Sequence, residues 1–142
     1  MRAYYRRLTS DDPVVRANAA RHWSMWEGAT SFLRVNPDYV AKFEEDAFAE
    51  AFARIECHYF VNGGFLRSPS QLLDDVDKIR HIPGVIVQGR YDMVCPIAAA
   101  DRLARAWSGA QYRVVPDAGH SSMEPGIRAA LVKATEDFKL YR

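Results

Sequence analysis

Asp92 and His120 are the side chains in this sequence whose types and spacing best suit acid–base chemistry. Asp92 follows the apolar run 85–87, which predicts a strand buried on both faces, and His120 lies in a loop after the next predicted strand. Because open α/β sheets gather their sites at the carboxyl ends of parallel strands, we expect both side chains at one sheet edge. There the carboxylate can accept the Nδ1 proton of the imidazole and leave Nε2 available as a general base.

Each of these residues also has an ordinary structural explanation, because an aspartate can cap a helix and a loop histidine can be hydrogen-bonded locally. Taken together, their order and topology match the acid and the histidine of an α/β-hydrolase triad. The nucleophile of such a triad is missing: the sequence contains no G-x-S-x-G, and no serine follows a predicted strand as an elbow requires. Ser121 and Ser122 adjoin His120, but neighbours in a loop seldom have the geometry for proton transfer.

The elements that must position Asp92 and His120 lie in the second half of the chain. Strands are predicted over 84–88 and 111–115, helices over 96–107 and 126–139, and a loop over 116–125. This order predicts two parallel strands joined by a right-handed crossover, and therefore an α/β fold. Two strands alone do not make a stable sheet, so we expect their neighbours to be missing or to lie in another chain.

The first half of the chain is expected to be helical. Asp12-Pro13 predicts the start of a helix that runs to about residue 28, and Asn36-Pro37 starts a longer helical stretch that Gly63-Gly64 ends. In that stretch, apolar residues recur at helical spacing, so we expect the face that they form to be buried. These residues are Phe48, Phe52, Ile55 and Tyr59. The composition changes near residues 76–83, between this helical half and the predicted strands.

The composition excludes several classes of protein. The chain has 142 residues, 49% of them apolar and 26% charged, as an ordinary globular domain does. Its net charge of +1 gives no electrostatic case for nucleic acid or for an anionic membrane. No apolar run approaches the roughly 20 residues that span a bilayer, and the N-terminus has no signal-peptide core. With only two cysteines as well, we expect a cytoplasmic protein without a cofactor or a bound metal.

Four motifs resemble the C-terminal half of proline iminopeptidases (prolyl aminopeptidases), which are serine hydrolases of the α/β-hydrolase fold. They are RHWSMWEGATS, FARIECHYFVNGGFL, HIPGVIVQGRYDMVCP and VPDAGHSSMEPGI. The resemblance covers nearly the whole chain. It implies a helical cap over residues 1–76, followed over residues 77–142 by the last two strands and last helices of the hydrolase core, with Asp92 and His120 as catalytic acid and base.

The resemblance also implies a substrate, namely a peptide with a free N-terminal proline whose amino group is held by two cap glutamates. The matching positions are Glu27 in MWEG and Glu56 in RIECHYF. Both stand near aromatic residues, and a poorly solvated carboxylate pairs strongly with a cation. The alternative is that each is a solvated helix glutamate that pairs with a nearby arginine.

In that family, the nucleophile, the oxyanion hole and the first six strands precede the segment that this chain resembles. We therefore expect the chain to be inactive alone, to need a complementary N-terminal half that supplies the serine, or to self-associate. One alternative is a non-catalytic remnant or interaction module that binds an amine between Glu27 and Glu56. Another is a fragment of an epoxide hydrolase or dehalogenase, which would share Asp92 and His120 but has no evident use for the glutamates.

Overall fold

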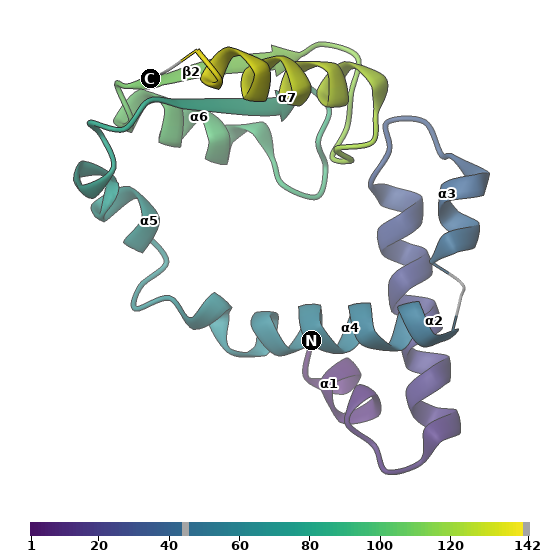
Figure 1. Cartoon of the computed structure of the whole chain (residues 1–142). Coiled ribbons are helices and arrows are strands. Elements are labelled where there is room, and N and C mark those ends of the chain that lie inside the picture. The colour runs from purple at the N-terminus through teal and green to yellow at the C-terminus, as the bar shows by residue number, and fades with distance from the viewer. Residues whose placement is uncertain (44–45, 141–142) are drawn as a thin grey trace. The chain divides into compact units, whose positions relative to one another are not determined.

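The computed structural model describes residues 1–43 and 46–140, and the chain divides into two compact units (Figure 1). The first unit comprises Met1–Thr30 and Val35–Arg67, and the second comprises Ser31–Arg34 and Ser68–Arg142. The predicted division between residues 76 and 77, and the roles assigned to its two parts, stay predictions.

The first unit is helical, as predicted. Asp12 Oδ1 accepts a hydrogen bond from Val14 N at 2.8 Å just where α2 begins, and Asn36 Oδ1 accepts one from Tyr39 N at 3.1 Å as the N-cap of α3. The stretch expected to be one long helical segment contains two helices, α3 and α4. The elements are α1 (Arg2–Leu8), α2 (Pro13–Thr30), α3 (Pro37–Lys42), α4 (Asp46–Val61) and the short 3-10 turn η1 (Gly63–Phe65).

Small residues form the contact between α2 and α4. The buried cluster consists of Leu8, Ala19, Ala20, Trp23, Ala49, Ala53 and Cys57. The prediction of a buried aromatic face on α4 is wrong in large part, because Phe48, Ile55 and Tyr59 are exposed and only Phe52 packs against this cluster. The alanines next to that face allow the two helix backbones to approach closely, and α4 therefore turns its alanine face toward α2.

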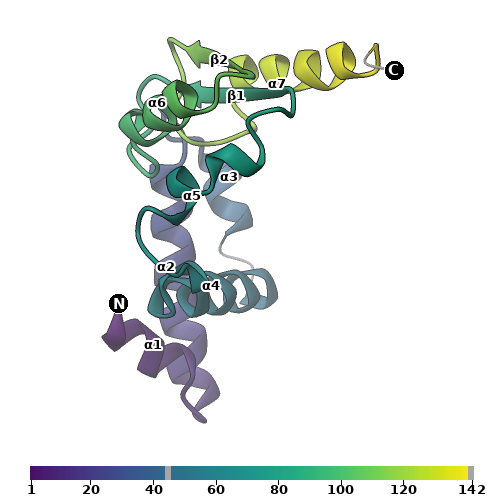
Figure 2. The same ribbon diagram turned by 90° about the vertical axis from the view of Figure 1, so that its left-hand side faces the viewer.

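The second unit is a mixed α/β arrangement built on two parallel strands, β1 (Gly84–Gly89) and β2 (Ala110–Val115). Their register pairs Gly84 with Ala110 and Gly89 with Val115, which confirms the predicted parallel pair. Helices α6 (Ile97–Ala106) and α7 (Pro125–Phe138) both contact the two strands (Figure 2). The unit also contains α5 (Gln71–Asp74) and the turn η2 (Val76–Lys78).

The core of the second unit forms where β2 and its following loop meet α7. Val115, Ala118 and Ile127 are buried together, and Val87 and Ala130 pack against them. Within residues 1–43 and 46–140, none of the helices combines the length and the apolar character that crossing a bilayer requires.

Candidate active site

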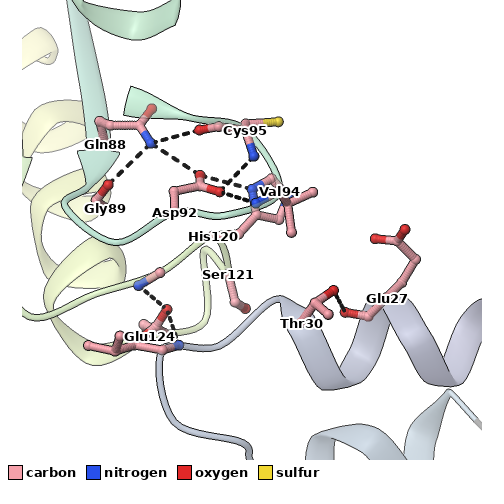
Figure 3. A network of polar contacts seen from close by, with 12 residues as sticks. Glu27, Thr30, Gln88, Gly89, Asp92, Val94, Cys95, His120, Ser121 and Glu124 are labelled. Atoms are coloured by element: carbon pink, nitrogen blue, oxygen red, sulfur yellow. Dashed lines mark hydrogen bonds and ion pairs between the residues drawn. The ribbon is translucent and has the colours of Figure 1, made fainter. Parts of the chain in front are cut away.

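Asp92 lies in the turn that follows β1, and both oxygens of its carboxylate accept hydrogen bonds (Figure 3). Oδ1 accepts from the backbone N–H groups of Val94 at 3.0 Å and Cys95 at 2.7 Å. Oδ2 accepts from Gln88 Nε2 at 3.1 Å and faces His120 Nδ1 at 3.0 Å. The side chain is only 7% exposed, so these partners replace the water that a carboxylate needs. An ionised carboxylate, which only accepts, suits all of these donors at once.

His120 completes the pair that the sequence predicts at this edge. Because the Asp92 carboxylate is an acceptor, Nδ1 of His120 is the donor, and this fixes the neutral ring as the Nδ1–H tautomer. Nε2 then carries the lone pair, and the side chain is 37% exposed. The arrangement therefore holds one nitrogen of the ring against a buried acid and leaves the other able to accept a proton from a reacting group.

Backbone contacts hold the loop that carries His120. The N–H groups of His120 and Ser121 both donate to the Ser31 carbonyl oxygen, at 2.9 and 2.8 Å. At the end of β1, a Cβ added to Gly89 would overlap the backbone oxygen of Gly119, so only glycine permits this approach. The turn after β1, which carries Asp92, and the loop after β2, which carries His120, are thus packed against each other.

Glu124 is a residue of this loop that the sequence reasoning missed. Its carboxylate is buried, and Oε1 accepts from Gly119 N at 2.6 Å and from Leu33 N at 3.4 Å (Figure 3). One oxygen thereby joins the segment before α3 to the residue that precedes His120. The sequence offers one signal, a glutamate just before Pro125 at a helix start, but nothing in it indicates that this carboxylate is buried.

Glu56 lies in the first unit, where its carboxylate contacts an aromatic residue. Oε2 accepts a hydrogen bond of 2.6 Å from the indole nitrogen of Trp23, whose ring packs edge-on against Tyr4. Glu50, by contrast, forms the arginine pairs expected of a solvated helix glutamate, with Arg16 and Arg54, both at 3.2 Å. The two glutamates therefore have different partners, arginines for Glu50 and an indole N–H group for Glu56.

Glu27 lies on α2, one helical turn after Trp23, and its side chain is partly buried. Residues four apart lie on one helix face, so Glu27 and Trp23 share a face of α2. Asp92 and His120 lie in the second unit. The amine-binding and catalytic roles assigned to these four residues stay predictions.

The acid–histidine pair lies at the carboxyl ends of two parallel strands, and comparisons with known proteins show what this chain resembles. No protein-family model matches the chain. It is 58% identical to a probable proline iminopeptidase of Leptolyngbya boryana over 136 residues, which make up 96% of this chain and 42% of the relative. It is 56% identical to the proline iminopeptidase of Xanthomonas citri over 138 residues (97% and 44%) and to that of Arabidopsis thaliana over 137 residues (96% and 36%).

The resemblance indicated by the four motifs is therefore confirmed: the chain is homologous to proline iminopeptidases. It spans 36–44% of the length of these relatives.

Proposed function

We propose that this chain supplies the catalytic acid, the catalytic base and the amine-binding carboxylates of a proline iminopeptidase, a serine-type enzyme that releases N-terminal proline from peptides. The observation that carries the proposal is the 3.0 Å contact between Asp92 Oδ2 and His120 Nδ1, with the acid buried and Nε2 available. Names shared by relatives at 56–58% identity support the choice of reaction.

In this reaction, His120 Nε2 accepts the hydroxyl proton of a serine as the serine oxygen bonds to the carbonyl carbon of the N-terminal proline. Asp92 stabilises the imidazolium that forms and keeps Nδ1 protonated. The C–N bond of the peptide breaks as the imidazolium returns the proton to the leaving amine, which leaves a prolyl ester on the serine. Water then hydrolyses the ester through the same nitrogen, and proline and the serine hydroxyl are released.

The serine in this scheme comes from outside the 142 residues, since the sequence contains no G-x-S-x-G. The serine nearest to the base along the chain, Ser121, is unsuited to attack. It is 5% exposed, and its hydroxyl accepts a hydrogen bond of 3.2 Å from Met123 N. This hydrogen bond stabilises the turn that follows His120. A serine able to attack must therefore approach His120 from another segment.

The amine site that we propose consists of Glu27 and Glu56 beside the Trp23 ring. The indole N–H fixes one oxygen of Glu56, and the aromatic wall limits its solvation. A secondary ammonium on a small apolar ring suits such a place, because charge pairing strengthens where water is scarce. A neutral or acylated N-terminus offers no charge to these carboxylates.

We infer further that β1 and β2 are the final strands of a larger α/β-hydrolase sheet. Within the described residues, β1 pairs with β2 alone, and a two-stranded sheet is marginal by itself. The relatives have more than half of their length outside the match, which is enough for additional strands. A complementary N-terminal half would thus bring both the missing strands and the serine.

The experiment compares the chain alone with the chain co-expressed with the part of the Xanthomonas citri relative that lies outside the match. We expect the chain alone to leave a proline arylamide intact and the pair to hydrolyse it, with the activity lost in His120→Ala. Hydrolysis by the chain alone that His120→Ala abolishes would show that the serine is in this chain. No hydrolysis by a folded pair would refute the assignment as a peptidase.

A further inference from the structure

Gln88, near the end of β1, forms a buried polar contact that the reaction scheme does not use. Its side-chain nitrogen lies 3.1 Å from Asp92 Oδ2, 3.2 Å from the Gly89 carbonyl oxygen and 3.2 Å from the Cys95 carbonyl oxygen (Figure 3). All of these neighbours are acceptors, so the amide nitrogen and not the amide oxygen must face them. The residue is 9% exposed, and its orientation is therefore fixed by the protein.

The Gln88 nitrogen donates to the same carboxylate oxygen that faces His120. Oδ1 of Asp92 is held by two backbone N–H groups, and those contacts alone leave the position of Oδ2 to the rotation of the carboxylate. A second donor on Oδ2, anchored in a strand, fixes that rotation. The same nitrogen also holds the Cys95 carbonyl and so closes the turn that carries Asp92.

We infer that Gln88 is a positioning residue: it sets the plane of the Asp92 carboxylate so that Oδ2 is presented to His120. The expected effect on catalysis rests on the proposed function. The expected effect on the turn that carries Asp92 does not. Gln88→Met keeps the length of the side chain and removes the donor. Gln88→Glu would place a second carboxylate against Oδ2 and the Cys95 carbonyl, where like charges and acceptors repel.

The catalytic test is a double-mutant cycle in the chain assembled with the Xanthomonas citri segment. The free energy of one hydrogen bond to a charged group corresponds to roughly a 10-fold change in rate. Gln88→Met should therefore lower kcat for a proline arylamide by about 10-fold with little change in KM. Gln88→Glu should lose more. In an Asp92→Asn background, Gln88→Met should cost little further activity, because its effect passes through the Asp92 carboxylate.

The matched control is Gln111→Met, which makes the same change at an exposed position of β2 and should leave kcat unchanged. The inference would be overturned if Gln88→Met alone left kcat unchanged. It would also be overturned if the double variant lost as much activity as the two single losses combined. A purely structural role would give additive losses, because it would not depend on the charge of Asp92.

A second measurement is independent of peptidase activity. In the 142-residue chain itself, Gln88→Met should speed amide hydrogen exchange at Val94 and Cys95, which bond to Oδ1, by about the same 10-fold factor. The amide of Tyr91, which bonds to the Ala118 carbonyl oxygen at 3.0 Å, is the internal reference and should not change. Unchanged exchange at Val94 and Cys95 would overturn the inference. If the assembled wild type is inactive but this exchange responds as expected, the peptidase assignment fails and the role of Gln88 stands.

Discussion

Trp23 and Glu56, on separate helices and 33 residues apart, are joined by a 2.6 Å hydrogen bond from the indole nitrogen to the carboxylate. The indole occupies one oxygen of Glu56 and so orients the charge beside an aromatic wall. Such a glutamate differs from a surface helix glutamate, whose charge is screened by water and by arginine partners. This difference makes the proposed amine site testable with a control in the same helix.

Glu56→Gln removes the charge and keeps the shape, so in the assembled enzyme it should weaken recognition of a free N-terminal amine. We expect kcat/KM for a free prolyl arylamide to fall roughly 10- to 100-fold, the value of a hydrogen bond to a charged group. The matched control Glu50→Gln, in the same helix, should change it little, because Glu50 forms partly exposed pairs with arginines. Equal losses on an N-acylated or ester substrate would mean that Glu56 supports the fold and does not bind the amine.

Glu124→Ala should destabilise the second unit, because it leaves the buried N–H group of Gly119, and the partly buried one of Leu33, without this acceptor. An unsatisfied buried donor costs about 1–3 kcal/mol, and we expect a loss of that order in urea unfolding. Glu124→Gln retains an acceptor oxygen and should lose less. Glu136→Gln in α7, at an exposed pair with Lys139, is the control and should be nearly neutral. If Glu124→Ala is as stable as this control, the carboxylate does not hold the loop.

The burial of Cys57 leads us to expect that the free energy of unfolding falls at alkaline pH. Burial raises the pKa of its thiol above the ordinary value. As the pH rises through the ordinary range for a thiol, the unfolded chain ionises at Cys57 while the folded chain stays protonated. Stability from this group is therefore complete below that range and falls as the pH rises through it. Unfolding free energies at neutral pH and at about pH 9.5, near thiol ionisation, should differ more for the wild type than for Cys57→Ala. Equal differences would contradict this account.

The parts that the sequence predicted well are those in which local pattern and packing agree. The β-branched run at Val85–Val87 and the Asp12-Pro13 start give the observed strand and helix, since strand propensity and capping act over a few residues. The expectation that this strand is buried on both faces is wrong, because residues 85–87 are only partly buried where β2 is the one strand beside them in the described chain. The contact between Asp92 and His120 also followed, because parallel topology brings both strand ends to one edge. Their chemistry stays a prediction.

The sequence could not predict features that depend on which neighbouring side chains pack around a residue in the folded chain. On α4, the aromatic residues and the alanines Ala49 and Ala53 both recur at helical spacing, and only the approach of α2 decides that the alanines are buried. Gln88 and Glu124 are polar residues that usually lie at surfaces, and their burial arises from contacts across turns of the fold. No periodicity encodes such contacts.

The isolated chain should expose apolar surface that a complementary half would cover. Trp26 is 69% exposed, Ile55 61% and Tyr59 53%, and β1 pairs with β2 alone among the described strands. Such surface favours association. We expect sedimentation to show self-association and a dye for apolar surface to bind, and both to decrease on co-assembly. A monodisperse monomer with a sharp melt and no dye binding would contradict this prediction.

The central claim is that this chain supplies the base for a serine that lies elsewhere, and covalent labelling by a fluorophosphonate tests it most directly. The reagent reacts with a serine that an adjacent base activates. After labelling of the co-assembled pair, mass spectrometry should find the phosphonyl group on a serine of the Xanthomonas citri segment and none on this chain. His120→Ala in this chain should abolish that label, and Gln111→Met should leave it unchanged. A label on any serine of this chain, or a label on the other segment that persists in His120→Ala, would contradict the account.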